Sequence, residues 1–202
     1  MQGFGRKKYR DMNLYDLISH AQNDNFDALE ELIKREQKNV YSSFCYLGAN
    51  KENISDLTQE VLFRMSKNIK SLKNPSLFKS WLGQIITNLF YDELRKKQRY
   101  PEAISIDSFW LNEEESENSI FHICDNTLKP DEKTVAKEMT DIIREMICKL
   151  PEHFRVVIVL RELQGLSYEE IAKITQTNVG TVKSRIARAR NKLQECLKPY
   201  LT

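Results

Sequence analysis

The segment that decides the fold is LPEHFRVVIVLRELQGLSYEEIAKITQTNVGTVKSRIARARNKLQ, residues 150–194. Its apolar side chains recur at helical spacing, and Gly165 is a typical stop after the first helix. Ser167 and Glu170 have the spacing of a capping box, in which the Ser hydroxyl accepts the Glu N–H and the Glu carboxylate bonds back to the cap. Asn-Val-Gly at residues 178–180 predicts a turn before a final basic helix. This order is typical of a helix-turn-helix.

The final helix divides into an apolar side and a polar side. The apolar side is predicted to consist of Val182, Ile186, Ala189, Leu193 and Leu197. The other side gathers polar and basic residues that are candidate contacts to DNA, namely Thr181, Lys183, Ser184, Arg185 and Arg188. Taken alone, such a basic helix is more often a solvated face. The preceding cap, short helix and turn favour DNA binding instead, with Arg suited to guanine edges and Lys or Ser to phosphates.

Composition and charge limit the class of protein. A chain of 202 residues has room for one or two domains, and its net charge of +2 averages over segregated blocks. The blocks at residues 6–10 and 95–99 are basic, residues 102–132 are mainly acidic, and the helix-turn-helix end is basic again. This asymmetry is typical of a protein with local nucleic-acid surfaces.

The four cysteines are scattered and form no CxxC pair, so we predict reduced thiols rather than a disulfide framework or a zinc site. No metal or cofactor is expected. No apolar run approaches the roughly 20 residues that span a bilayer, and the basic N-terminus lacks the hydrophobic stretch of a secretion signal. We therefore expect a cytoplasmic protein without membrane insertion.

The first hundred residues predict a separate helical block, without any alternating strand pattern. Asn25 and Ser76 are placed to cap two of its helices. Helical periodicity fails between residues 101 and 133, where Pro, Asn, Ser and acidic residues accumulate. We therefore predict an all-α protein with a first domain at residues 11–100, a flexible acidic linker at 101–133 and a second domain at 134–202.

Two groups of motifs resemble bacterial RNA polymerase sigma factors. DLTQEV at residues 56–61, followed by Trp81-Leu82 and DELR at 92–95, resembles their first domain, and the helix-turn-helix segment resembles their last. Two domains with little else is the arrangement of the extracytoplasmic-function class. The resemblance implies a protein that binds core RNA polymerase and directs it to particular promoters, typically in a stress or envelope response.

The resemblance also implies roles for individual residues. Asp56, Gln59 and Glu60 would contact the clamp of the polymerase, and the polar residues of the last helix would read the minus-thirty-five element. Asn88 and Asp92 match positions beside a pocket for a flipped minus-ten base, shaped by the loop at residues 71–79. Arg95 and Lys96 belong to a basic run suited to phosphate contacts with little sequence specificity.

The class further implies an anti-sigma factor as a partner. Two other interpretations remain open. One is a helix-turn-helix regulator that acts without being a polymerase subunit. The other is a nucleic-acid enzyme, which the sequence disfavours because it has no phosphate-binding glycine loop, metal-ligand spacing or ordered nucleophile and base.

Overall fold

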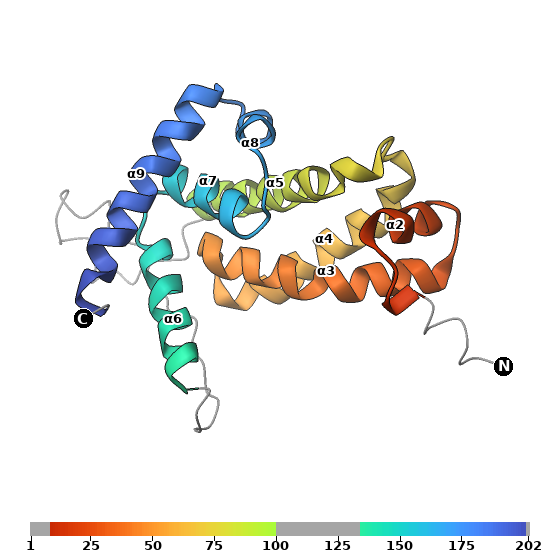
Figure 1. The fold of residues 1–202 in the computed structure, drawn as a ribbon, viewed down its shortest axis with the longest axis horizontal. Coiled ribbons are helices and arrows are strands. Elements are labelled where there is room, and N and C mark those ends of the chain that lie inside the picture. Colours follow the sequence, from red (N-terminus) through yellow and green to blue (C-terminus); the bar gives the residue numbers. More distant parts are fainter. Residues whose placement is uncertain (1–8, 100–133, 201–202) are drawn as a thin grey trace.

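The computed structural model describes residues 9–99 and 134–200, which are helical and contain no strand, so the all-α prediction is confirmed. An N-terminal helical region comprises α2 (Leu14–Gln22), α3 (Phe26–Leu47), α4 (Ile54–Asn68) and α5 (Phe78–Arg99). A C-terminal helical region comprises α6 (Thr134–Cys148), α7 (Glu152–Glu162), α8 (Tyr168–Ile174) and α9 (Val179–Leu197), as drawn in Figure 1. The predicted acidic linker lies outside the described residues.

Helix starts follow the side-chain caps closely. Asn25 accepts the N–H of Ala28 at the start of α3, and the capping box of Ser167 and Glu170 is present at α8, so both predictions are confirmed. The prediction for Ser76 is wrong: Asn74 is the cap instead, and it begins a 3₁₀ turn, η3 (Pro75–Leu77), that runs into α5. Since the Asn74 carboxamide accepts the N–H of Ser76, the turn starts two residues earlier than the sequence suggested.

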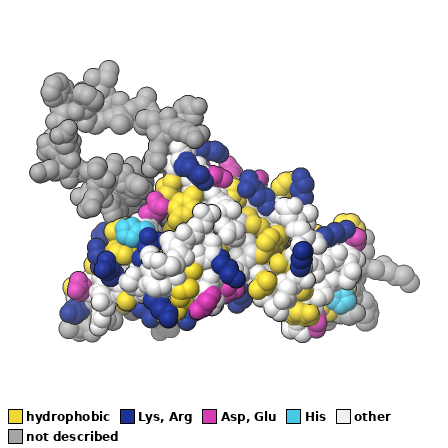
Figure 2. All heavy atoms as spheres, turned by 90° about the horizontal axis from the view of Figure 1, so that it is seen from above, with side chains coloured by type: hydrophobic (Ala, Val, Ile, Leu, Met, Phe, Trp, Pro, Cys, Tyr) yellow, Lys and Arg dark blue, Asp and Glu magenta, His cyan; other side chains and the backbone are white. Residues whose placement is uncertain are grey.

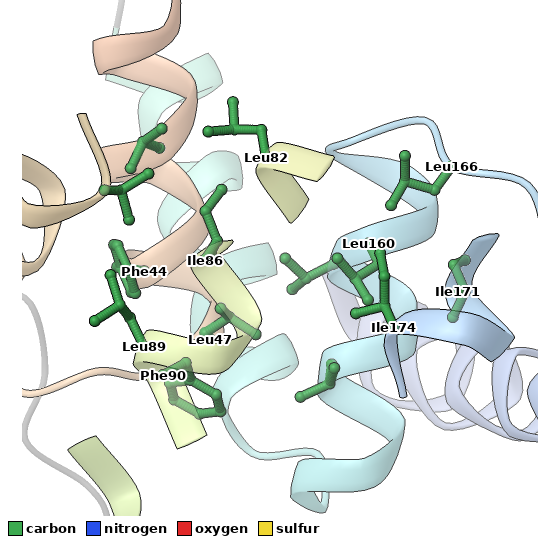
Figure 3. Close-up of a cluster of buried hydrophobic side chains, with 14 of the residues drawn as sticks. Phe44, Leu47, Leu82, Ile86, Leu89, Phe90, Leu160, Leu166, Ile171 and Ile174 are labelled. Atoms are coloured by element: carbon green, nitrogen blue, oxygen red, sulfur yellow. The ribbon is translucent and has the colours of Figure 1, made fainter. Parts of the chain in front are cut away.

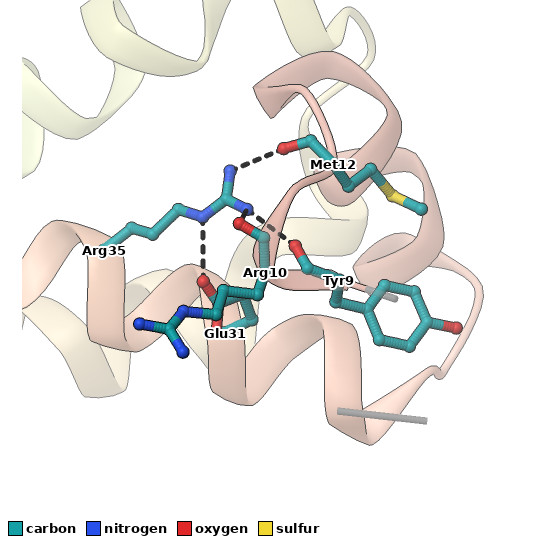
Figure 4. Close-up of polar contacts among 5 residues, drawn as sticks. All are labelled: Tyr9, Arg10, Met12, Glu31 and Arg35. Atoms are coloured by element: carbon teal, nitrogen blue, oxygen red, sulfur yellow. Dashed lines mark hydrogen bonds and ion pairs between the residues drawn. The ribbon is translucent and has the colours of Figure 1, made fainter. Parts of the chain in front are cut away.

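The N-terminal region is built around α3, the long helix against which α2, α4 and α5 all pack. Its core contains Leu17, Leu32, Phe44 and Val61, none of which has measurable exposure. Arg35 of α3 fixes the residues that precede α2 (Figure 4). Its guanidinium donates to the main-chain carbonyls of Tyr9, Arg10 and Met12 at 2.6, 2.9 and 2.7 Å, and its Nε donates to Glu31 at 3.0 Å.

The C-terminal region is built around α7, which is surrounded by α9, α8 and α3. Residues 154–160 of α7 are buried on every side of the helix, including Arg155. The Arg155 guanidinium donates to the carbonyl of Cys148 at 2.6 Å. Because a helix apolar all round must be covered all round, α7 acts as the central element of this region.

The two helical regions share one continuous apolar core (Figure 3). Helix α3 packs against α6 and α7, and α5 packs against α8. Leu82 and Ile86 of α5 are 1% exposed, and Leu160 and Leu166, on the facing side in Figure 3, are at most 2% exposed. This packing was not predicted from the sequence, which indicated two domains joined by a flexible linker.

Candidate nucleic-acid and protein interfaces

Helix α9 presents its polar residues on the side away from the core. Asn178 caps the helix by accepting the N–H of Thr181 at 2.7 Å, so the helix begins at Val179 and Gly180 lies inside its first turn rather than in a preceding loop. Val182, Ile186 and Ala189 are buried, as predicted. This anchoring fixes which side chains point outward.

Among the outward-facing residues of α9, Lys183, Ser184 and Arg188 are exposed, whereas Thr181 and Arg185 are half-buried. The Ser184 hydroxyl donates to the carbonyl of Thr181 at 2.9 Å. Three cations and two hydroxyls therefore lie along little more than two turns of one helix. Side chains of these types bind phosphates and base edges.

Arg185 is the least exposed of the three cations, and it lies on a helix that packs against α7. Its charge opposes the effect of burial and of Glu152, which together raise the pKa of Tyr91 on α5. Desolvation, followed by the charge of Arg185, lowers the pKa of His153 at the start of α7. The charge of Arg185 therefore acts on groups of both helical regions.

The polar stripe on α5 consists of Asn88, Asp92, Arg95 and Lys96, all of them exposed. Gln84 donates to the Asn88 side-chain oxygen at 2.8 Å, which leaves the Asn88 amide N–H₂ and one lone pair of that oxygen for a ligand. Asp92 accepts from Arg95 at 2.8 Å. This ion pair offsets the repulsion that Asp92 alone would exert on a phosphate.

The loop ahead of α5 is held from α2. The Gln22 amide donates to the carbonyls of Ile69 at 3.0 Å and Leu72 at 2.6 Å, and Lys70 pairs with Asp24 at 2.5 Å. The loop was predicted from the sequence, but the side chain that fixes it was not. Gln22 is separated from Ile69 by 47 positions and from Leu72 by 50 positions along the chain.

Helix α4 carries the three residues expected at a protein interface. Asp56 and Gln59 are exposed, and Glu60 is partly exposed and bonded to Arg64 at 2.6 Å. Phe63, one turn beyond Gln59, is 60% exposed on the same side of the helix. Phe63 was not predicted as a site residue, although an aromatic residue four positions after Gln59 in a polar row was a usable signal.

The face of the molecule drawn in Figure 2 mixes charges of both signs. Figure 2 shows Lys and Arg side chains along the length of one face, with Asp, Glu and apolar side chains between them. Within residues 9–99 and 134–200, no three His, Cys, Asp or Glu side chains converge in a way that would hold a metal ion. No helix in these ranges is both long enough and apolar enough to cross a membrane.

Comparison with known proteins follows the same division of the chain. Residues 32–100 match the family model of sigma-70 region 2, and residues 140–193 match that of sigma-70 region 4. The chain is 32% identical over 186 residues to the ECF RNA polymerase sigma-E factor of Escherichia coli K12, covering 92% of this chain and 94% of that one. The chain belongs to the extracytoplasmic-function family of RNA polymerase sigma factors.

Further relatives of this sigma factor agree. The sigma-E factor of Haemophilus influenzae is 31% identical over 186 residues, covering 92% of this chain and 95% of that one. The sigma factor RpoE of Bartonella quintana, solved in complex with the anti-sigma factor NepR, has a TM-score of 0.65 at 26% identity, covering 84% of this chain and 96% of that one. CnrH, solved with the cytosolic domain of CnrY, shares the fold with a TM-score of 0.61 at 21% identity, over 92% of this chain and 97% of that one.

Membership in this family confirms the predicted function: the protein is a sigma factor for promoter-specific transcription initiation. The rival interpretation, a regulator that is not a polymerase subunit, is not favoured, because the matches include region 2 as well as the helix-turn-helix.

Proposed function

We propose that this sigma factor divides promoter recognition between its two helical regions. The C-terminal region, residues 134–202, reads the minus-thirty-five element through Thr181, Lys183, Ser184, Arg185 and Arg188. The N-terminal region, residues 11–100, reads the minus-ten element through Asn88, Asp92, Arg95 and Lys96. Core polymerase binds the row of Asp56, Gln59 and Glu60 on α4.

The observation that carries this proposal is the orientation of α9. Its buried side fixes the helix on α7 and α8, and the opposite side presents cations and hydroxyls near the helix N-terminus. In helix-turn-helix proteins the N-terminal part of the second helix contacts base edges. Arg185 is the least exposed of the three cations of the set, and a guanidinium can form a geometrically specific, bidentate contact.

The stripe on α5 has the chemistry of a different ligand. An amide N–H₂ at Asn88 can pair with the edge of an unstacked base, and the Arg95–Asp92 pair orients a guanidinium beside it. Extruding a base costs a few kcal/mol, which such contacts must offset. Lys96 extends the stripe by one more cation suited to the phosphate backbone.

We further propose an anti-sigma factor as a partner, because the similar sigma factor RpoE of Bartonella quintana was solved in complex with the anti-sigma factor NepR. We propose the cytoplasm as the site of action, where RNA polymerase works. A role in a stress or envelope response follows from the same class. The protein acts as a non-catalytic subunit, and the chemistry of RNA synthesis belongs to the polymerase.

The proposal is tested by mixing the purified protein with bacterial core polymerase and fragmented genomic DNA and mapping the 5′ ends of the transcripts. We expect discrete start sites that depend on the protein and share an upstream motif. Arg185→Ala should then reduce discrimination between matched and mutated minus-thirty-five elements by about 1–3 kcal/mol.

Arg190→Ala provides the matched control, because it removes a cation of the same helix that is bonded to Glu162 at 2.7 Å and faces α7 instead. The ratio of transcription from matched and mutated elements cancels any general effect on polymerase binding. Equal ratios for the wild type and Arg185→Ala would contradict the assignment of α9 to the upstream element.

A further inference from the structure

Two cysteines from different helical regions meet at the end of α3. The Sγ of Cys148, the last residue of α6, lies 3.5 Å from the carbonyl oxygen of Cys45 and 3.9 Å from that of Tyr46. Both cysteines are partly exposed thiols. They are 103 positions apart in the sequence, so the packing of α3 against α6 is what brings them together.

The separation of the two cysteines suits a disulfide. A carbonyl oxygen lies about 2.4 Å from its own Cα, so the Cα of Cys45 is within about 6 Å of the Cys148 sulfur. Disulfide-linked cysteines have Cα atoms about 4.4–6.8 Å apart. Rotation of the two side chains between staggered positions is the movement that bond formation requires.

A buried cation borders the Cys148 thiol. Arg155 of α7 is 5% exposed, and a Cβ placed on Gly48 would lie 3.3 Å from its Nη1 and 3.8 Å from the Cys148 Sγ. Among the described residues, the Nε of Arg155 has no hydrogen-bond partner. Desolvation lowers the pKa of Arg155, and the charge of ionised Cys148 opposes that effect. A cation beside a partly exposed cysteine favours the thiolate, which is the reactive form.

We propose that Cys148 and Cys45 form a redox site, in which peroxide oxidises Cys148 and Cys45 converts the product into a disulfide that joins α6 to α3. The Cys148 thiolate attacks one oxygen of hydrogen peroxide, so that the O–O bond breaks, a sulfenic acid forms and hydroxide leaves. The Cys45 thiol then attacks the sulfenic sulfur, and the S–O bond breaks as water leaves with the Cys45 proton. In total both thiols are oxidised to one disulfide, and the peroxide is reduced to water. In the cytoplasm such a bond is transient, because cellular thiols reduce it again.

The disulfide joins the two helical regions covalently. The proposed minus-ten residues lie on α5 and the proposed minus-thirty-five residues on α9, so a bond between α3 and α6 fixes the distance between the two DNA surfaces. Helix α5 touches α8 in this arrangement, whereas the two elements are about 25 base pairs apart, or about 85 Å of duplex. We therefore expect the oxidised chain to lose promoter-specific transcription. This consequence rests on the proposed function, whereas the thiol chemistry does not.

The chemistry is tested on the full, reduced chain with hydrogen peroxide, which is removed by desalting before any further step. We expect one intramolecular disulfide, identified by mass spectrometry as linked peptides that contain Cys45 and Cys148, and reversed by dithiothreitol. Cys45→Ser should leave Cys148 as a sulfenic acid, which dimedone traps. Cys148→Ser should abolish both products. Cys196→Ser removes the exposed thiol of α9 and is the matched control, which should leave both products unchanged.

The role of Arg155 is tested separately, by alkylation of Cys148 with iodoacetamide. Arg155→Gln should move the pH dependence of alkylation to higher pH and slow the reaction with peroxide by about tenfold, because the cation that favours the thiolate is lost. Arg155→Lys retains a cation and should keep most of the rate. Circular dichroism shows that each variant remains helical, and alkylation of Cys196 in the same sample corrects for general reactivity. A helical Arg155→Gln chain that reacts at the wild-type rate would contradict this role.

The consequence for promoters is tested by adding core polymerase to the chain after the peroxide has been removed. We expect the oxidised wild type to give little protein-dependent transcript and to recover fully after treatment with dithiothreitol. Transcription by Cys45→Ser and by Cys148→Ser should not respond to the same treatment, because neither variant can form the bond.

Three results would overturn the redox site. They are a disulfide that joins Cys148 to Cys124 or Cys196 instead of Cys45, dimedone labelling of Cys196 without labelling of Cys148, and equal transcription by the crosslinked and the reduced chain. Failure of the proposed function has a different signature, because the reduced wild type would then give no protein-dependent transcript while the disulfide still formed.

Discussion

Two faces of the N-terminal region contrast in how their side chains are satisfied. The face formed by α3 and α5 is covered by the C-terminal region, and its polar groups Asn39 and Ser43 bond to Gln164. The face formed by α4 is open to solvent, and its polar groups bond only within the helix, as Glu60 does with Arg64. The polar groups of the covered face are hydrogen-bonded within the chain, whereas the exposed side chains of α4 are accessible to a partner protein.

The two faces each contain a phenylalanine that illustrates the difference. Phe44 of α3 has no measurable exposure and lies beside Leu47 and Leu89 in the cluster of Figure 3. Phe63 of α4 is 60% exposed, with the Lys67 ammonium 5.9 Å from its ring centroid. Burial of an aromatic ring stabilises the fold, whereas an exposed ring within a polar row is typical of the anchor residues of protein interfaces.

Truncation of the buried ring should have the largest effect. Phe44→Ala is expected to reduce the free energy of unfolding of the N-terminal region by about 3–5 kcal/mol, because it removes a fully buried side chain and leaves a cavity. Urea denaturation followed by circular dichroism measures this change. Phe63→Ala is the control, with an expected change within about 0.5 kcal/mol. Similar losses for the two variants would contradict the contrast between the faces.

Truncation on the open face should instead affect binding. Phe63→Ala, and separately Gln59→Ala combined with Glu60→Ala, should each weaken association with core polymerase by about 1–2 kcal/mol while the fold is retained. Competition against a labelled sigma factor measures this affinity. Gln37→Ala combined with Glu30→Ala is a matched control on α3, since it also removes an exposed Gln and a Glu paired four residues ahead, to Lys34 at 2.7 Å. An equal loss in the control would assign the effect to charge alone.

The sequence predicted the exposed helix faces better than the covered face of α3 and α5. Helix periodicity and the caps at Asn25 and Ser167 fixed where helices lie and which side chains point outward, because those signals act within a few residues. The positions of Asp56, Gln59 and Lys183 on exposed helix faces follow directly. Their assignment to polymerase or DNA came from the family resemblance rather than from periodicity.

The covered face of α3 and α5 depends on contacts between residues far apart in the sequence, which local sequence patterns do not encode. Gln164 meets Ser43 across 121 residues of sequence, and neither residue differs locally from an ordinary surface residue. Gly83 of α5, where a Cβ would lie 3.1 Å from Cδ1 of Leu166, offered the one local hint, since an isolated glycine in a helical pattern often marks a close approach. Asn74 illustrates a different limit, since it lies two residues from Ser76 and both residue types can cap a helix.

The smallest effect is expected at Arg185 of α9, in the region that covers the face of α3 and α5. Its charge is the second cause, after desolvation, that lowers the pKa of His153. Arg185→Ala should therefore raise the pKa of His153, though not fully to its ordinary value, because the desolvation remains. An NMR titration of the His153 ring measures this shift, with the resonance assigned by its loss in His153→Asn. Lys183→Ala, which removes a charge that does not affect the pKa of His153, should leave the titration unchanged.

The sign of the associated stability change follows from the lowered pKa. Since the folded chain holds the His153 proton less tightly than the unfolded chain, stability is complete above about pH 6.5 and decreases as the pH falls below it. Arg185→Ala should reduce this acid loss, because the protonated imidazole then no longer lies beside a fixed cation.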